Sequence, residues 1–140
     1  MPRTLIVLGL FGSLLASAPA AACDCVRLDP KGPHFANDLD RIAKYYPIAA
    51  EGVIEAQGDY AWRFRSTHEY RGPGKASYAI ELISDCSIEP QTMKGLIGKP
   101  VFLLLAGGPD RYEASRCVNL LGGDADAAIR ARVLSLCPTR

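Results

Sequence analysis

The chain has 140 residues, of which 49% are apolar and 22% are charged, and its formal net charge is +1. A chain of this size and composition can bury one hydrophobic core. A charge so close to zero argues against partners that are bound mainly by electrostatic attraction, such as nucleic acid or an anionic membrane surface.

Residues 1–22 have the pattern of a cleavable export signal. Arg3 supplies a positive charge, an apolar stretch follows it, and residues 20–22 are alanines that suit cleavage. The apolar stretch is too short for a membrane span, so we expect no transmembrane helix. Cleavage after Ala22 predicts one domain, residues 23–140, with 15 basic residues (16 less Arg3) and 15 acidic ones. The sequence therefore predicts an exported protein that is extracellular, periplasmic or at the cell surface.

The predicted elements begin with a helix. Apolar residues recur at helical spacing from Phe35 to Tyr46, and Pro47 ends the run. A strand is predicted next at residues 49–57, in which Gly52 indicates a bulge or a bend.

The clearest strand covers residues 60–70, because its side chains alternate between an aromatic face and a charged face. One interpretation makes Trp62 and Phe64 a stacking platform for a ligand, as in some oligonucleotide/oligosaccharide-binding (OB) folds. We expect core packing instead, because the charged residues lie on the opposite face, where Arg63 and Arg65 are expected to be solvated. The aromatic face consists of Tyr60, Trp62, Phe64, His68 and Tyr70, with His68 expected in the core or at its rim.

Further strands are predicted at residues 78–84, 101–105 and 111–117, of which the second is a continuous apolar run suited to burial on both sides. A helix is predicted from Asp124, its N-cap, to the residues before Pro138. Five short strands with peripheral helices predict an all-β fold with flanking helices. The expected architecture is a small, partly open antiparallel barrel of the OB type.

All five cysteines, at positions 23, 25, 86, 117 and 137, lie in the part that is predicted to be exported. An oxidising compartment favours disulfides, and an odd number leaves at least one cysteine unpaired. A structural zinc site usually needs ligands paired closely in sequence, and Cys23 with Cys25 is the only such pair. We therefore expect disulfides and no intrinsic metal or cofactor. The sequence shows no constellation typical of catalysis, so we predict that the protein is not an enzyme.

Several short motifs follow one another in the order found in a known family. They are Cys23–Val26, Ala50–Ile54, Tyr70–Gly72, Cys86, Gly98–Leu105, Cys117 and Cys137. Their order resembles that of the netrin-like domains, and specifically the N-terminal domain of the tissue inhibitors of metalloproteinases. The resemblance implies a five-stranded OB-like (netrin-like) barrel stapled by disulfides. It implies the pairs Cys23–Cys86 and Cys25–Cys117, and it leaves Cys137 as the odd thiol, because no cysteine lies near Phe35 to pair with it.

In that family, the free α-amine and the carbonyl oxygen of the first cysteine chelate the catalytic zinc of a protease and displace its attacking water. The resemblance therefore implies that this chain inhibits a zinc metalloprotease through Cys23. The following side chain, Asp24, would enter the specificity pocket of the protease. The residues implied to contact the protease are Cys23, Asp24, Cys25, Val26, Asp85, Cys86 and Ser87.

Two of these residues depart from the family pattern. Animal members carry a small polar residue where this chain has Asp24, and an ionised carboxylate is costly to bury in an apolar pocket. The family usually has glycine where this chain has Ser87. We therefore expect weak activity against animal matrix proteases and leave open a zinc protease with a basic pocket.

An alternative from another functional class starts from the same cysteine. The run from Ala21 to Cys23 also resembles a bacterial lipoprotein processing site, although Ala20 stands where a larger aliphatic residue is usual. A lipid on Cys23 would leave an even set of cysteines and a membrane-tethered structural or binding module without inhibitory activity. Disulfides with a purely structural role are a further alternative. Of these hypotheses, we favour the soluble netrin-like module with a free terminal amine.

Overall fold

The computed structural model of this chain describes Cys25 and residues 28–137. The predicted export signal and three of the predicted protease contacts, Cys23, Asp24 and Val26, lie outside the described residues. Among the described residues, no helix is both long enough and apolar enough to cross a membrane.

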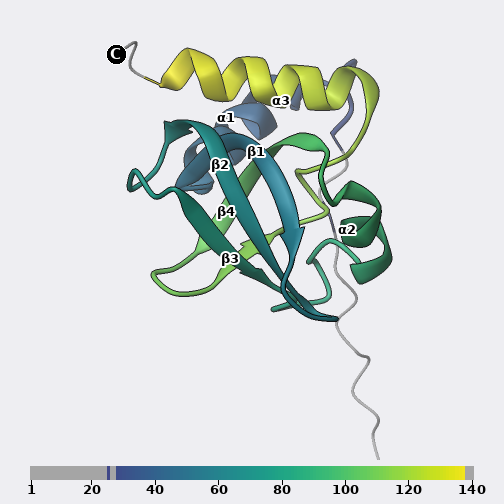
Figure 1. The fold of residues 1–140 in the computed structure, drawn as a ribbon. Helices are drawn as coiled ribbons and strands as arrows, with labels where there is room; N and C mark the ends of the chain where they lie inside the picture. Colours follow the sequence, from purple (N-terminus) through teal and green to yellow (C-terminus); the bar gives the residue numbers. More distant parts are fainter. Residues whose placement is uncertain (1–24, 26–27, 138–140) are drawn as a thin grey trace, which may run out of the picture.

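The chain folds into a five-stranded closed β-barrel with helices packed around it (Figure 1). The strand order is β1-β2-β3-β5-β4, and the barrel closes where β1 pairs with β4. In chain order the elements are α1 (Phe35–Tyr45), β1 (Ile48–Ala56), β2 (Ala61–Arg71), β3 (Ser77–Glu81), α2 (Pro90–Leu96), β4 (Pro100–Gly107), β5 (Tyr112–Ala114) and α3 (Gly123–Leu136).

The expectation of a partly open, antiparallel barrel was wrong in both respects. The barrel is closed, and β3 pairs with β5 in parallel through Ile80 and Tyr112, whereas the other strand pairs are antiparallel. Strands around a closed ring can alternate in direction only if their number is even. A ring of five strands must therefore contain at least one parallel pair, and here it is the short contact between β3 and β5.

The barrel interior holds the main hydrophobic core. Trp62 and Phe64 are both fully buried there, so the expectation of core packing is confirmed and the stacking-platform interpretation is wrong. The predicted burial on both sides is confirmed for residues 103–105, because Leu103 and Leu105 point into the barrel and Leu104 packs outward, whereas Val101 and Phe102 are only partly buried. Each such aliphatic or aromatic side chain stabilises the fold by roughly 1.5–3 kcal/mol when it is fully buried.

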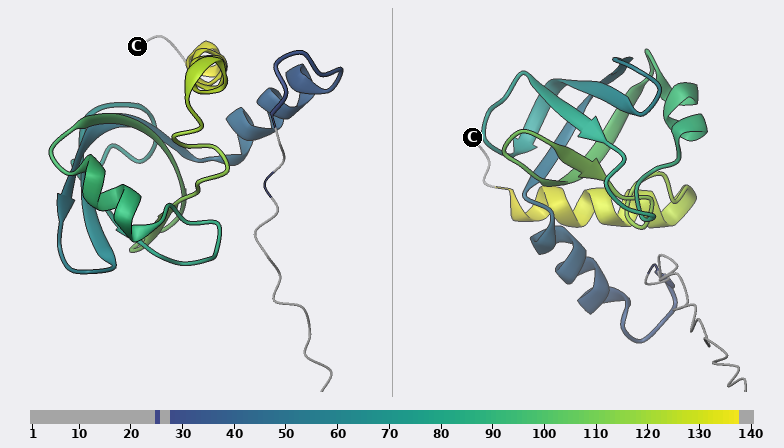
Figure 2. Two further views of the ribbon diagram at one scale, coloured as in Figure 1. Left: turned by 90° about the vertical axis from the view of Figure 1, so that its right-hand side faces the viewer. Right: turned by 90° about the horizontal axis from the view of Figure 1, so that it is seen from below.

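A second core lies between the outer wall of the barrel and two helices. Helix α3 runs along the outside of the barrel, and α1 packs beside it (Figure 2). This second core explains why Leu104 is buried although it faces away from the barrel interior. Its buried members are Ala43, Tyr46, Ala49, Leu104, Val118, Ile129 and Val133.

The predicted bulge in the first strand is present at Gly52. The register between β1 and β2 shifts between Glu51 and Gly52, which brings the two strands unusually close. A Cβ atom at Gly52 would lie 2.2 Å from the carbonyl oxygen of Arg65 and 2.8 Å from the ring of Phe64. Only glycine can occupy this position without moving β2.

The second half of β2 departs from the predicted alternation. Two register shifts against β1 break the regular inward and outward order of its side chains. His68 is exposed and contacts the ring of Tyr70, with ring centroids 4.3 Å apart, so it lies at the surface and not in the core. Arg63 and Arg65 are exposed, as expected of a solvated strand face, and Arg65 forms an ion pair with Glu55 at 2.8 Å.

Helix α2 was not predicted. It has seven residues, begins with Pro90 and places Met93 in the barrel core, and it covers one end of the barrel (Figure 2). A helix of two turns is too short to show a hydrophobic period, although proline at its first position is a usual helix start. The predicted strand at residues 78–84 is also shorter in the structure, because β3 ends at Glu81.

Candidate functional site

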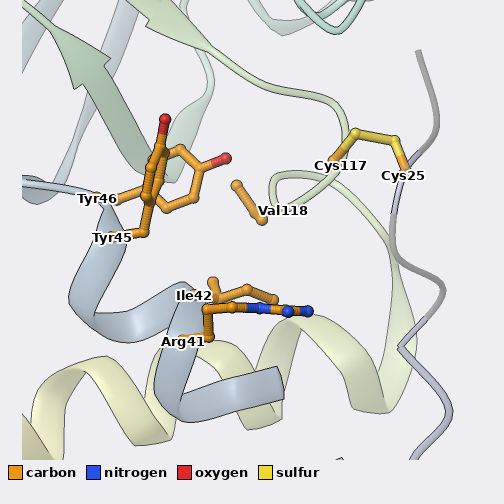
Figure 3. Close-up of a pocket in the computed structure, with 7 residues that line it drawn as sticks. All are labelled: Cys25, Arg41, Ile42, Tyr45, Tyr46, Cys117 and Val118. Carbon is orange, nitrogen blue, oxygen red and sulfur yellow. A yellow bond between two sulfur atoms is a disulfide. The ribbon is translucent and has the colours of Figure 1, made fainter. Parts of the chain in front are cut away.

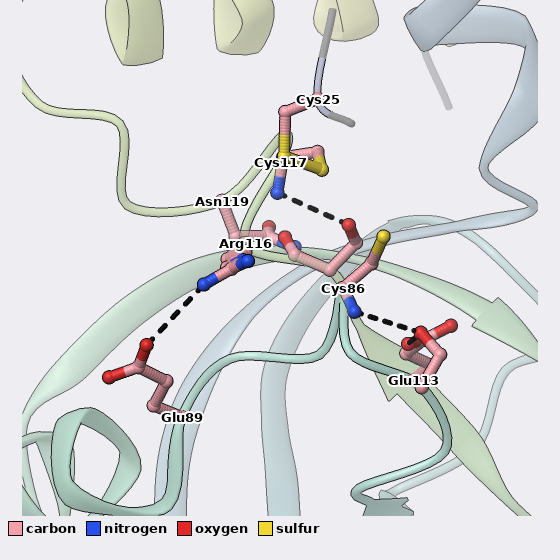
Figure 4. Close-up of a disulfide and its surroundings, with 9 residues drawn as sticks. Cys25, Cys86, Glu89, Glu113, Arg116, Cys117 and Asn119 are labelled. Atoms are coloured by element: carbon pink, nitrogen blue, oxygen red, sulfur yellow. Dashed lines mark hydrogen bonds and ion pairs between the residues drawn. A yellow bond between two sulfur atoms is a disulfide. The ribbon is translucent and has the colours of Figure 1, made fainter. Parts of the chain in front are cut away.

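Cys25 and Cys117 form a disulfide that ties the segment before α1 to the residues after β5 (Figure 4). Their Cα atoms are 5.1 Å apart, and 92 positions separate them in sequence. This bridge is the second of the two that the family resemblance implies. In the chain-entropy model, a loop of this length makes a disulfide worth about 4.6 kcal/mol of stability.

Cys86 reaches the same edge of the barrel from the loop after β3. Its carbonyl oxygen accepts a hydrogen bond of 2.7 Å from the backbone N–H of Arg116, and Ser87 forms a β-bridge with Ser115. Cys86 is itself disulfide-bonded, and its predicted partner, Cys23, lies outside the described residues. The structure thus brings Cys25, Cys86 and Cys117 to one edge, which we call the cysteine edge (Figure 4). Cys137, the expected odd thiol, is free.

The loop of residues 82–87, next to the cysteine edge, is shaped by the hydroxyl of Ser87. Its Oγ accepts hydrogen bonds from the backbone N–H groups of Ile83 at 3.1 Å and Ser84 at 3.2 Å, and donates one of 2.6 Å to the carboxylate of Glu113. The Ser84 hydroxyl also donates to Glu113 and accepts from the N–H of Cys86 at 3.1 Å. Ser87 therefore has a structural role in this loop. From the sequence it was named only as an implied protease contact, and this role was not predicted.

This loop exposes two large aliphatic side chains. Leu82 is 44% exposed and Ile83 is 53% exposed, and the predicted contact Asp85 is exposed beside them. Leu82 belongs to the predicted strand of residues 78–84, but in the structure the strand ends one residue before it, at Glu81. The serines at 84 and 87, whose hydroxyls compete with strand pairing, are the sequence signal that could have indicated this turn.

The other side of the cysteine edge is fixed by a buried amide. Asn119 Oδ1 accepts a hydrogen bond of 2.8 Å from the N–H of Leu104, and its Nδ2 donates to the carbonyl oxygens of Leu104 at 2.9 Å and Ser115 at 3.0 Å. These bonds hold residues 115–119 against β4 where no strand continues. Burial raises the pKa of Tyr46, which lies in the second core with Val118, above its ordinary value.

The described residues show no arrangement that would hold a metal ion of their own. In the part of the chain that the structure covers, no three His, Cys, Asp or Glu side chains come together in a potential metal site. The cysteine edge is a rigid support that combines a disulfide, a hydrogen-bonded loop and exposed aliphatic side chains. The start of the predicted mature chain is attached to this support through Cys25.

Comparison with protein-family models, with curated proteins and with solved structures gave no match. The geometry of the cysteine edge and the chemistry of its residues are therefore the features of this chain that bear on its function.

Proposed function

We propose that the mature chain inhibits a zinc metalloprotease through the α-amine and carbonyl oxygen of Cys23, on an OB-like, netrin-like barrel. The observation that carries the proposal is the Cys25–Cys117 disulfide. It fixes the chain two residues after Cys23, the predicted mature N-terminus, to a rigid edge of the barrel. An inhibitory terminus needs such a support, because a preorganised chelating group loses little conformational entropy on binding.

The barrel supports the finer fold assignment. The order β1-β2-β3-β5-β4, closed by β1 and β4, with helix α2 between β3 and β4, resembles the five-stranded OB type. The family resemblance of the cysteines adds the netrin-like variant of that fold. The fold alone implies no activity, so the functional proposal depends on the terminus and its support.

The chemistry of the proposal requires cleavage immediately before Cys23. The freed α-amine has an ordinary pKa near 8, so its neutral, zinc-binding form is accessible near neutral pH at modest cost. The amine nitrogen and the carbonyl oxygen would occupy the coordination positions of the protease zinc that otherwise hold the attacking water. Leu82, Ile83 and Asp85 would contact the protease beside them, because they are exposed on the rigid loop next to the cysteine edge.

The lipoprotein alternative uses the same cysteine differently. A thioether at Cys23 would take that sulfur out of disulfide chemistry and favour a bond between Cys86 and Cys137. Cys86 is disulfide-bonded and Cys137 is free, and this distribution favours the inhibitor hypothesis over the tethered module.

The test is a matched pair of proteins that differ by one residue at the terminus. One begins at Cys23, and the other carries one extra alanine before it. Both are assayed against a panel of zinc metalloproteases that includes thermolysin-type and matrix-type catalytic domains. We expect the first protein to inhibit at least one protease and the extended protein to lose that inhibition, because its amine is displaced from the zinc. Equal inhibition by both forms, or none by the first, would overturn the proposal.

A further inference from the structure

A pocket opens directly beside the cysteine edge, between α1 and the segment after β5 (Figure 3). Its volume is about 240 Å³. One wall is the Cys25–Cys117 disulfide, and the opposite wall is formed by two consecutive tyrosines at the end of α1. The lining residues are Cys25, Arg41, Ile42, Tyr45, Tyr46, Cys117 and Val118. We call it the tyrosine pocket.

The walls of the tyrosine pocket suit an aromatic ring. Tyr45 is 70% exposed, an unusual state for so large an apolar surface, and its ring meets that of Tyr46 edge to face at 5.0 Å. Ile42 and Val118 supply aliphatic surface between the tyrosines and the disulfide. A cavity of about 150 Å³ with apolar walls accommodates benzene, so a pocket of this volume has room for one ring.

The tyrosine pocket has a cationic group in its wall. Arg41 is the only charged residue among the described residues that line the pocket, and its side chain is 63% exposed. Within the described residues, the acceptor that Arg41 contacts is the carboxylate of Asp38, through one Nη atom at 2.9 Å. A guanidinium group has further N–H donors, and these remain able to bind a second carboxylate.

We propose that the tyrosine pocket docks an aromatic side chain of a protein partner whose neighbouring residues are acidic. The ring would enter between Tyr45 and the disulfide, and a carboxylate next to it in the partner would bind Arg41. Tyrosine and arginine are the residue types that most often dominate protein interfaces, particularly beside a preformed hollow. The pocket is preformed here, because the disulfide fixes one wall and the burial of Tyr46 in the second core fixes the other.

This inference does not depend on zinc chelation. The lining residues named above are all described residues, and the proposed contacts do not involve Cys23. A partner held at the cysteine edge would lie next to it, because Cys25 and Cys117 belong to both sites, but the pocket can also bind a partner that is no protease. Its test therefore uses peptides and no protease, so that failure of the inhibition proposal and failure of this one are distinguishable.

The probe is the peptide acetyl-Glu-Phe-Glu-amide, added to the isotope-labelled mature protein and followed by nuclear magnetic resonance. We expect saturable chemical-shift changes at the backbone amides of Arg41, Ile42, Tyr45 and Val118. Two matched peptides separate the contributions of ring and charge. Replacing Phe with Ala removes the ring, and replacing both Glu residues with Lys reverses the charge. Each change is expected to weaken binding about three-fold or more.

Two substitutions of exposed residues test the pocket from the side of the protein. Arg41→Gln and Tyr45→Ala are each expected to weaken binding of the acidic peptide about three-fold or more, with little change in thermal unfolding. Arg111→Gln is the matched control, because Arg111 is an exposed arginine in an ion pair at the barrel surface and does not line the pocket. The proposal is overturned if the lysine peptide binds as well as the acidic one. It is equally overturned if Arg41→Gln leaves binding unchanged, or if the shifts fall outside the pocket.

Discussion

The hydroxyl of Ser87 joins three partners, two backbone N–H groups and the Glu113 carboxylate, inside the loop that carries Cys86. We expect Ser87→Ala to lower the free energy of unfolding by about 1–3 kcal/mol, because the two N–H groups would lose their acceptor in a partly buried loop. Urea unfolding of both proteins measures the difference. Ser135→Ala, at an exposed position on α3, is the control and should change stability by less than about 0.5 kcal/mol. Equal losses in the two variants would refute the role assigned to Ser87.

Asp24 is the residue on which inhibitory strength should depend most, if the proposed function holds. We expect Asp24→Ser to tighten inhibition of a matrix-type metalloprotease by about tenfold or more, because it removes an ionised carboxylate from an apolar specificity pocket. Inhibition constants measured for the two mature proteins test this expectation. A weaker or unchanged constant for the serine variant would mean that the side chain at this position does not enter such a pocket.

Strands β1 and β2 can approach as they do only because of Gly52. We expect Gly52→Ala to lower the free energy of unfolding by about 3 kcal/mol, since its Cβ would collide with the backbone of Arg65. Chemical denaturation provides the measurement. Gly58→Ala, in the turn between the same strands, is the matched control, because a Cβ there meets no atom within 4 Å. Similar stabilities for the two variants would show that β2 moves aside without cost.

Helices α1 and α3 are joined by an ion pair between Asp40 and Arg132, with an Nε–Oδ1 distance of 2.5 Å. The hydrogen bond from Arg132 lowers the pKa of Asp40 below its ordinary value of 3.8. Because the pKa is lower in the folded state, the pair stabilises the fold at pH values above the ordinary pKa of Asp40. This contribution is lost as the pH falls through the pKa of the folded state. The pair therefore contributes at neutral pH and not in strong acid.

The corresponding prediction compares the wild type with Asp40→Asn. The wild type should have the higher free energy of unfolding near pH 7, and this difference should shrink as the pH falls below about 4. Urea unfolding at a series of pH values measures it. Arg132→Gln should lower the free energy of unfolding near pH 7 in the same way as Asp40→Asn, because it removes the other partner of the ion pair. A difference that stays constant down to pH 3 would show that the amide disturbs packing and that the ion pair contributes nothing.

At the scale of the whole molecule, disulfide bonding attaches the segment before α1 to the barrel. We expect peptide mapping without reduction to find Cys25–Cys117 and Cys23–Cys86, and alkylation of the unreduced, denatured protein to label Cys137 alone. The intact mass of the native protein should equal that of residues 23–140 less two hydrogens per bridge. A bond between Cys117 and Cys137 would contradict the fold as described. An added diacylglyceryl mass would contradict the proposed inhibitory terminus.

Local pattern in the sequence was enough to predict helices α1 and α3 and the positions of five strands. These elements have periods that can be recognised within ten or so residues, such as the alternation around Trp62 and Phe64. The bulge at Gly52 was predicted for a different local reason, because a glycine inside a strand indicates a bulge or a bend. Helix α2 was not, because its seven residues are too few to show a period. The family resemblance, and not any local pattern, provided the pairing of Cys25 with Cys117.

What only the tertiary structure decided depends on residues that are far apart in the chain. The closure of the barrel brings β1 against β4, and the parallel contact follows from closing a ring of five strands, which no single strand encodes. The role of Ser87 needs Glu113, and the tyrosine pocket needs Cys25 and Val118 to lie beside α1. The exposure of Leu82 and Ile83 is of the same kind, because their hydrophobicity alone predicts burial. A sequence pattern reports the preference of each segment, whereas a site is made by contacts between segments, and these are fixed only when the whole chain packs.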